Sequence, residues 1–240
     1  MSEAPPSRGD EQFAGQVNSM FDRISGVYDR MNRVMTAGLD RTWRARAAER
    51  SRLQPGQSAL DLCCGTGDVA LVLAERVGPE GKVIGADFSQ PMLDIASSKP
   101  TPAGSSPVEF QWADALELPY EDESFNAVTI AFGARNLADL DRGLEEMRRV
   151  LVPGGSLVIL EITQPRRQPL KGFFGLWFDR IVPLLGKLAG DSSAYEYLPR
   201  SVRSFPDAEA LGGRMDRSGL RHVRWTLMAG GIIALHSAVK

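Results

Sequence analysis

A short loop with two glycines, preceded by an acid, is the first segment whose residues could bind a reactive ligand. The segment ALDLCCGTGDVA places Asp61 four residues before Gly65, with Thr66 and Gly67 next in the chain. Glycines in a turn that follows an apolar strand let the backbone approach a bound molecule closely. The spacing also fits the loose G-x-G-x-x-A fingerprint of dinucleotide sites, but short glycine motifs of this kind often arise by chance. The loop therefore predicts a ligand site without identifying the ligand.

Two further acids, each at the end of an expected strand, narrow the choice of ligand. Asp87 stands 20 residues after Gly67, where a carboxylate can accept hydrogen bonds from both hydroxyls of a ribose. Asp114, in the segment FQWADALELPY, follows the next expected strand and can accept from the amino group of an adenine. Asp61 can face a cationic group in the loop. Any one of these acids could be a solvated loop residue, whereas three at successive strand ends favour a nucleoside ligand with a positive charge and no phosphate, such as S-adenosylmethionine.

The elements that must hold these residues alternate along the chain. Apolar residues from Val17 to Met35 recur at helical spacing, and a second short helix is expected from Leu39 to Leu53. Strands are expected at 58–62, 82–87, 108–112, 125–131 and 156–161, and helices between them at 69–77, 91–98 and 137–150. We expect the last of these helices to be stopped by Pro153-Gly154-Gly155. Such alternation predicts an α/β fold of parallel βαβ units, with helices on both faces of the sheet.

The second half of the chain departs from this alternation. Residues 164–203 contain interior prolines and long apolar runs, so we expect a helical insertion that covers the active site. A helix at 207–218 and an antiparallel hairpin joined through Ala229-Gly230-Gly231 are expected to follow. Residues 1–15, which are polar and rich in Pro and Gly, are predicted to be disordered. Residues 16–240 are predicted to form a single domain, in which 16–53 are N-terminal helices.

Composition excludes several classes of protein. A formal net charge of −2 over 240 residues argues against a general nucleic-acid binder. The two cysteines, Cys63 and Cys64, are adjacent, so they cannot link distant segments, and we interpret them as small packing residues before a tight turn. No metal site is predicted, because no cluster of Cys and His has the spacing of one. With no signal peptide or membrane-spanning run in the sequence, the predicted location is cytoplasmic.

Five segments of the chain resemble the C-methyltransferases of ubiquinone and menaquinone biosynthesis. They are YDRMNRVMTAGLDRTW at 28–43, DLCCGTGD in the loop, FGARN at 132–136, RVLVPGGSLVILEIT at 149–163 and DSSAYEYLPRSVRSFP at 191–206. The resemblance runs from about Phe21 to the C-terminus, and its first and fourth segments are much more specific than the glycine loop. It implies a class I S-adenosylmethionine-dependent methyltransferase fold, a Rossmann-like, mostly parallel seven-stranded sheet with a C-terminal antiparallel hairpin. It also implies cofactor contacts at Thr66, Asp87 and the Asp114-Ala115 pair, and C-methylation of a prenylated quinol, demethylmenaquinol.

The chain departs from the family pattern at two positions. Asp40 stands where the family usually has His, and Ala131 stands where it tends to have Ser. Asp40 could replace the histidine as a proton acceptor, although a carboxylate is ordinarily a weaker base than an imidazole. Ala131 offers only its backbone, so a side-chain contact to the cofactor is lost there.

The reaction that the resemblance implies needs residues that ionise a quinol hydroxyl. Arg135 and Asn136 directly follow the fourth expected strand, where a fixed cation and an amide donor could stabilise a developing phenolate. Arginine stays protonated and is a poor base, so Asp191, Asp40 or a bound water is the expected proton acceptor. The alternative for Arg135 is a surface salt bridge with Asp139 or Asp141.

The insertion is also expected to contact the prenyl tail. Residues 164–203 hold seven Lys or Arg against three Asp or Glu, together with many bulky apolar residues. Such a segment could form a tail channel and a weak anchor to anionic lipid, which makes peripheral contact with the inner face of the cell membrane a hypothesis. Tyr195 and Tyr197 could line the ring pocket or pack the insertion. The residues do not fix an oligomeric state, and a homo-oligomer is compatible with them.

Other functions besides C-methylation of demethylmenaquinol can be compared with the same sequence. A ubiquinone precursor or another small aromatic could be the acceptor, and the sequence hardly separates these from a menaquinone precursor. An NAD-linked oxidoreductase is supported by the glycine loop alone. A nucleic-acid methylase that modifies amino groups would carry an Asn/Asp-Pro-Pro-aromatic segment where FGARN stands. The intact loop, the three acids and Arg135-Asn136 argue against an inactive methyltransferase-like scaffold.

Overall fold

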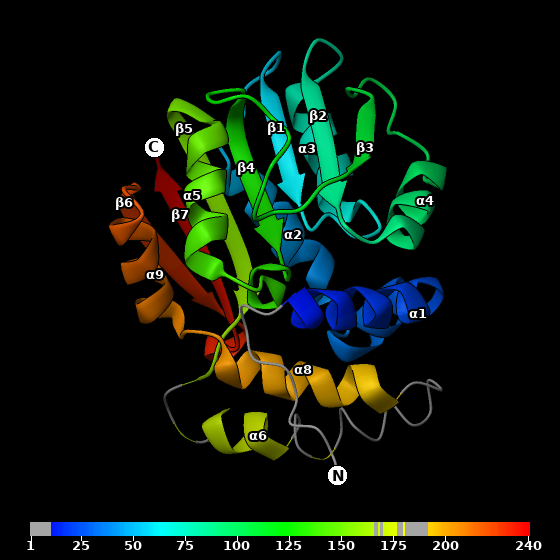
Figure 1. Ribbon diagram of the computed structural model, residues 1–240, viewed down its shortest axis with the longest axis vertical. Coiled ribbons are helices and arrows are strands. Elements are labelled where there is room, and N and C mark those ends of the chain that lie inside the picture. The colour runs from blue at the N-terminus through cyan, green and yellow to red at the C-terminus, as the bar shows by residue number, and fades with distance from the viewer. Residues whose placement is uncertain (1–10, 166–167, 169, 177–179, 181–191) are drawn as a thin grey trace.

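One mixed sheet forms the centre of the computed structural model, which describes residues 11–165, 168, 170–176, 180 and 192–240 (Figure 1). Its strand order is β3-β2-β1-β4-β5-β7-β6. The strands are β1 (Ser58–Leu62), β2 (Lys82–Asp87), β3 (Val108–Trp112), β4 (Phe125–Ala131), β5 (Leu151–Ile162), β6 (Arg221–Met228) and β7 (Ile233–Val239). Strands β1 to β5 pair in parallel, whereas β7 is antiparallel to both β5 and β6. The predicted parallel sheet with a C-terminal antiparallel hairpin is confirmed.

The strand order itself indicates where a ligand would bind. The connections leave β1 toward β2 and β3 on one side, and the later strands β4 and β5 lie on the other. Helices that follow β1 and β4 therefore diverge, and the carboxyl ends of these two strands border a crevice. Both the glycine loop and the segment that contains Arg135 come directly after these strands.

Helices cover the two faces of the sheet and its carboxyl edge (Figure 1). In Figure 1, α5 and α9 lie on the near face, α2 and α3 lie behind the sheet, and α1, α8 and α6 form a layer below its carboxyl edge. The described helices are α1 (Glu11–Met35), α2 (Leu39–Arg50), α3 (Asp68–Val77), α4 (Gln90–Ser98), α5 (Leu140–Val150), α6 (Leu170–Leu176), α8 (Ser192–Ser204) and α9 (Ala208–Arg217), with short 3₁₀ turns η1 (Ala134–Asn136) and η3 (Ala229–Gly231).

The core lies on both sides of the sheet because neighbouring side chains of a strand point to opposite faces. In β1, Leu60 and Leu62 pack in the cluster that includes residues of α5 and α9. Ala59 packs in the opposite cluster, with residues of α2 and α3. Asp61 alternates with Leu60 and Leu62, so its carboxyl lies on the side of α3.

Several boundaries differ from those that the sequence predicts, among them the end of α2, which lies at Arg50 rather than Leu53. Helix α5 begins at Leu140 rather than 137, because the side chain of Asp139 caps it by accepting a hydrogen bond from the Arg142 N–H at 3.0 Å. Strand β5 begins at Leu151 rather than 156, so Pro153-Gly154-Gly155 lies inside the strand and does not stop the helix, which ends at Val150. A register shift in β4 between Phe125 and Ala127 accommodates the extra residues of β5.

The N-terminal region and the insertion are described in part. Helix α1 begins at Glu11, so residues 11–15 are helical where the sequence predicts disorder; extending a long amphipathic helix by a few residues needs no new nucleus. Residues 1–10 lie outside the described residues. Of the predicted insertion at 164–203, α6 and α8 are described, and both lie in the layer below the sheet (Figure 1). The division into a terminus, N-terminal helices and an insertion otherwise stays a prediction. Among the described helices, none has the length and apolar character needed to cross a bilayer.

Candidate active site

The glycine loop between β1 and α3 is shaped by two glycines in the left-handed region of backbone space. Gly65 has φ +54° and Gly67 has φ +83°, a region that other residues adopt at a cost. A Cβ on Gly67 would also lie 2.7 Å from Cζ of Phe110, which is too close. The Gly67 N–H donates to the Cys64 carbonyl at 2.9 Å and closes the turn. Gly65 and Gly67, both predicted to bind the cofactor, thus shape a tight turn at the start of α3.

Asp87 connects this loop to the end of β2. Its carboxylate accepts hydrogen bonds from the Gly65 N–H at 2.8 Å and from the Ser89 N–H at 2.9 Å. Burial raises the pKa of Asp87 above its ordinary value, and the bonds from these N–H groups oppose that shift. Asp87 therefore lies at the predicted strand end and orders the loop, and its contact to a ribose stays a prediction.

Asp61 lies inside the protein beneath the loop. Its carboxylate is buried and accepts from the Thr129 hydroxyl on the neighbouring strand β4 at 2.6 Å. Burial raises the pKa of Asp61 to about 7, and Thr129 and the positive charge of Arg44 act in the opposite direction. A cation in the loop would favour the ionised carboxylate in the same way.

Asp114 and Ala115 follow β3 at the same edge of the sheet. Asp114 is exposed, and its carboxylate accepts from the Leu116 N–H at 2.9 Å, so it fixes a local turn. Ala115 is buried beneath it. The contact of Asp114 to an adenine stays a prediction.

Thr66 leads to a residue that the sequence reasoning missed. Its hydroxyl is buried and donates to the carboxylate of Asp29 on α1 at 2.6 Å. Asp29 also accepts from Nζ of Lys99 at 2.9 Å, and Lys99 in turn pairs with Asp68 at 2.6 Å. Asp29 stands in the segment YDRMN, which carries the family resemblance, but nothing in the sequence pairs it with the loop.

The two cysteines are packing residues, as predicted. Burial raises the pKa of both the Cys63 and the Cys64 thiol well above the ordinary value, so neither is a thiolate nucleophile at neutral pH. Cys63 packs so closely against Gly133 that no side chain fits at that glycine.

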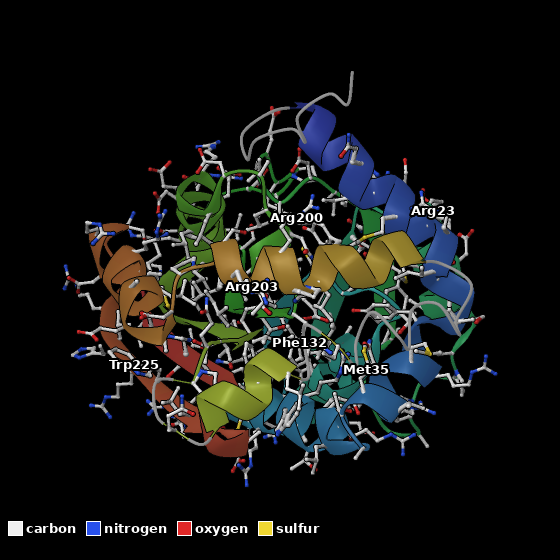
Figure 2. The ribbon with its side chains drawn as sticks, turned by 90° about the horizontal axis from the view of Figure 1, so that it is seen from below. Arg23, Met35, Phe132, Arg200, Arg203 and Trp225 are labelled. Carbon is white, nitrogen blue, oxygen red and sulfur yellow. The ribbon has the colours of Figure 1, made fainter. Side chains whose placement is uncertain are left out.

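A cavity of about 490 Å³ opens next to the loop, between the sheet edge and the helices below it. Most of its wall is apolar and comes from α1, α2, α8 and the segment after β4. Tyr28 of α1 joins the two sites, because it lines the cavity and its ring lies 4.0 Å from where a Cβ on Gly65 would stand. Figure 2 shows this layer from below, with the cavity residues Phe132 and Met35 labelled and α8 running beside α6. The polar residues of the wall are Tyr28, Asn32, Thr36, Asp40, Arg44, Arg135 and Tyr197.

Arg135 lines this cavity, but its ion-pair partner is not one that the sequence suggested. Its guanidinium pairs with the carboxylate of Glu161 in β5 at 2.8 Å, and both side chains are buried. It also donates to the Phe132 carbonyl. Burial alone would lower the pKa of Arg135, and Glu161 outweighs that effect so that the pKa is raised. The suggested partners act elsewhere: Asp139 caps α5, and Asp141 pairs with Arg214 at 2.8 Å.

Asn136 contacts Tyr197 of the cavity wall but is not itself among the described residues that line the cavity. The Tyr197 hydroxyl of α8 donates to Oδ1 of Asn136 at 3.1 Å. Tyr197 therefore lines the cavity and also packs the insertion, which joins the two alternatives that the sequence left open. The side chain of Tyr195 lies outside the described residues.

Of the two predicted carboxylate bases, the structure places one in the cavity. Asp40 is buried, lines the cavity and accepts from the Thr36 hydroxyl at 2.9 Å. Nε of Arg44, one helical turn later, lies 3.7 Å from Oδ2 of Asp40. Asp191 lies outside the described residues. Arg44 was missed by the sequence reasoning, because arginines at 41, 44 and 46 in α2 look alike until burial distinguishes them.

Comparisons with known proteins agree with this arrangement. The model of the ubiE/COQ5 methyltransferase family matches residues 9–240. A demethylmenaquinone methyltransferase of Thermus thermophilus is 47% identical over 222 residues, which cover 90% of this chain and 98% of that protein. One of Desulfitobacterium hafniense is 40% identical over 231 residues, or 95% of this chain and 90% of that protein.

A solved structure of low sequence identity to this chain also supports the fold. The crystal structure of a SAM-dependent methyltransferase from Aquifex aeolicus superposes with a TM-score of 0.60 at 21% identity, covering 82% of this chain and 88% of that one. The sheet with its antiparallel β7 is thus the class I methyltransferase fold. With a family model that matches nearly the whole chain, and relatives that share its length, the chain belongs to the ubiE/COQ5 methyltransferase family.

Proposed function

We propose that this protein transfers a methyl group from S-adenosylmethionine to a ring carbon of demethylmenaquinol, the last step of menaquinone biosynthesis. The relatives named demethylmenaquinone methyltransferase, at 40% and 47% identity, support this acceptor. The observation that carries the proposal is the cavity beside the glycine loop, whose apolar wall holds a buried carboxylate and two guanidinium groups. An apolar ring with ionisable hydroxyls suits such a wall.

The residues at the sheet edge fit S-adenosylmethionine better than a nicotinamide dinucleotide. Asp61 is a buried acid whose charge is opposed by burial, and a cationic ligand would offset that cost. The sheet also differs from the common dinucleotide order 3-2-1-4-5-6, because antiparallel β7 separates β5 from β6. Asp61, Gly65, Thr66, Gly67, Asp87, Asp114 and Ala115 would hold the cofactor, which supplies an electrophilic methyl group when bound.

Alignment is the main contribution of the chain to this reaction. The methyl group moves in a direct displacement, and positioning two reactants can lower such a barrier by about 7–11 kcal/mol in ideal cases. The α1 helix borders both sites through Tyr28, so it can fix the distance between them. Phe132, Trp43 and the apolar side chains of α1 would exclude water from the ring.

Ionisation of the quinol is the second contribution. A phenol has a pKa of about 10, so its proton must be removed before the ring carbon becomes a good nucleophile at neutral pH. Asp40 is the described carboxylate of the cavity wall and would accept that proton. Arg135, held in place by Glu161, would orient the oxygens of the ring, and Asn136 would position Tyr197 of the cavity wall.

A labelled methyl transfer tests the proposal directly. The protein is incubated with S-adenosylmethionine that carries a deuterated methyl group and a reduced demethylnaphthoquinol with a short prenyl chain, and products are read by mass. We expect the label on the naphthoquinol ring. Label on a ubiquinone-type benzoquinol alone would identify a different acceptor, and no label on either, with tight binding of NADH, would contradict the proposed chemistry.

We also propose that the layer below the sheet touches anionic lipid, because a prenylated quinol resides in a bilayer. Leu39 of the cavity wall is an exposed apolar residue, and Val34 of α1 and Leu176 of α6 are exposed as well. Arg33, next to Val34 in α1, is also exposed. Flotation with anionic vesicles should carry part of the protein with the lipid, and recovery of all of it from the lipid-free fraction would contradict this.

A further inference from the structure

The two guanidinium groups of the cavity differ in how well they are paired. Arg135 is bound by the Glu161 carboxylate at 2.8 Å, so its charge is neutralised inside the protein. Arg44 is 8% exposed, and its buried Nε has no hydrogen-bond partner among the described residues. Its nearest acid, Asp40, lies 3.7 Å from Nε, beyond hydrogen-bonding distance. A buried donor without an acceptor is costly, so in a native protein it calls for an explanation such as a catalytic role.

The surroundings of Arg44 keep it directed at the cavity. Its Cζ lies 5.5 Å from the centre of the Phe132 ring, which gives a cation–π contact, and both residues line the cavity wall. Three acids face it from the elements packed around it. Asp29 on α1 is engaged by Thr66 and Lys99, Asp61 on β1 is engaged by Thr129, and Asp40 on its own helix is engaged by Thr36.

We propose that Arg44 binds the ionised oxygen of the quinol, with Asp40 beside it as the acceptor of the hydroxyl proton. This inference rests on the proposed function and assigns a role within the same cavity. The O–H bond of the quinol breaks, the proton passes to a carboxylate oxygen of Asp40, and the phenolate that remains accepts from the Arg44 guanidinium. Arg135, already neutralised by Glu161, orients the ring and does not stabilise the charge.

A phenol that cannot be oxidised to a quinone provides the test. We would use 4-methoxy-1-naphthol, which keeps one hydroxyl of the naphthoquinol, with S-adenosylhomocysteine present to fill the cofactor site. Its ionisation is followed by ultraviolet absorption in the bound state. A cation within contact distance lowers the pKa of an acid by about 1 to 3. We expect a decrease of that size on binding to the unaltered protein.

Variants of α2 separate charge from packing. Arg44→Met keeps the contact with Phe132 and removes the charge, so the pKa of the bound naphthol should return to or above that of the free naphthol. Arg44→Lys keeps a charge and should give an intermediate value. Arg41→Met, at an exposed position of the same helix, is the matched control and should behave as the unaltered protein. Binding of S-adenosylhomocysteine to each variant checks that the fold is intact.

The outcomes distinguish this inference from the proposed function. If the naphthol binds with the same lowered pKa to the unaltered protein and to Arg44→Met, the assignment of Arg44 is wrong while the quinol site stands. If it binds to the unaltered protein with no change in pKa, the assignment is wrong whatever the variants do. If S-adenosylhomocysteine binds and the naphthol does not, the proposed acceptor and the role of Arg44 are wrong together.

Discussion

Asp29 on α1 and Thr66 in the glycine loop are joined by a hydrogen bond of 2.6 Å between side chains that stand 37 residues apart in the chain. Asp22, two helical turns earlier, accepts in the same way from the hydroxyl of Ser89 after β2, at 2.6 Å. One side of α1 therefore holds the loops that are predicted to bind the cofactor. Another side, which includes Phe21 and Tyr28, forms the wall of the cavity.

Removing the carboxylate of Asp29 should weaken cofactor binding. In Asp29→Ala, Thr66 and Lys99 lose their common partner, so α1 no longer fixes the loop. A hydrogen bond to a charged group contributes about 1.5–3 kcal/mol, so we expect the affinity for S-adenosylhomocysteine to fall by roughly 10- to 100-fold in calorimetry. Arg30→Ala, at an exposed position of α1, is the control. Equal affinities of the two variants for S-adenosylhomocysteine would show that the contact between Asp29 and Thr66 does not affect cofactor binding.

The charge of Asp29 also predicts a dependence of stability on pH. Burial by itself would raise the pKa of Asp29, but the bonds from Thr66 and Lys99 outweigh it and the pKa is lowered. An acid whose pKa is lowered in the folded state stabilises the fold above its ordinary pKa of 3.8, and this stabilisation is lost as pH falls through the lowered value. Urea unfolding of the unaltered protein and Asp29→Asn should therefore differ at neutral pH and converge in acid. A constant difference would contradict the prediction.

Asp61 should make the binding of S-adenosylmethionine depend on pH. With a pKa of about 7 it is partly protonated near neutrality, and it must ionise to attract a sulfonium. Affinity for S-adenosylmethionine should then rise as pH passes upward through about 7, with release of a proton, whereas S-adenosylhomocysteine, whose sulfur carries no charge, should show a weaker dependence. Calorimetry in buffers of different ionisation enthalpy measures the proton. The same pH dependence for both ligands, or for Asp61→Asn, would argue against a direct ionic role.

In the protein without ligand, Asp61 changes the dependence of folding stability on pH in the opposite direction to Asp29. Its pKa is raised in the folded state, so its contribution is greatest below its ordinary pKa of 3.8 and is lost as pH rises through about 7. The protein without cofactor should therefore lose some stability between these values, and added S-adenosylmethionine should restore it.

Breaking the buried ion pair in β5 should destabilise the fold. Glu161→Gln leaves the buried Arg135 without its carboxylate, and loss of one partner from a buried pair costs about 3–5 kcal/mol. The free energy of unfolding in urea measures this. Glu145→Gln, which removes an exposed carboxylate 3.6 Å from Arg142, should cost about 0–1 kcal/mol and serves as the control. Similar losses in both variants would show that Arg135 and Glu161 contribute no more than a surface pair.

Asp87→Ala should abolish methyl transfer while leaving a folded protein. The carboxylate accepts from two backbone N–H groups, one in the glycine loop and one after β2, so its loss frees the loop and removes the predicted ribose contact. Each unpaired buried donor costs about 1–3 kcal/mol, and affinity for S-adenosylhomocysteine should fall by at least about 10-fold. Undiminished turnover in the methylation assay would overturn the assignment of the cofactor residues.

The sequence predicts best what local patterns determine. Strands β1 to β4 match the expected ranges, because apolar runs bounded by turn residues follow the period of a strand. Asp87 could be placed at a strand end for the same reason. The start of β5 could not be predicted from local patterns, since it depends on pairing with Phe125 across the sheet. The cap at Asp139 was missed as well, although an acid three residues before Arg142 is a recognisable helix start.

The pairings that complete the site are long-range and leave little local trace. Arg135 meets Glu161 across 26 residues of sequence, and Asp29 meets Thr66 across 37. Nearby acids such as Asp139 looked like better partners for Arg135 because sequence distance was the only guide. A signal existed for Glu161, which is an acid in the apolar run LVILEI and so needs a buried partner. No comparable feature of the sequence distinguishes Arg44 from the other arginines of α2.

Because α1 contacts both the cofactor loops and the cavity, the binding of the cofactor and the binding of a molecule in the cavity must affect each other. Any molecule in the cavity that displaces this helix loosens Thr66 and Ser89. The factor by which that molecule weakens binding of the cofactor must equal the factor by which the cofactor weakens binding of the molecule. Inhibitors that wedge against Tyr28 would therefore lose potency as the cellular pool of methyl donor grows, while those that support the helix in its place would gain it.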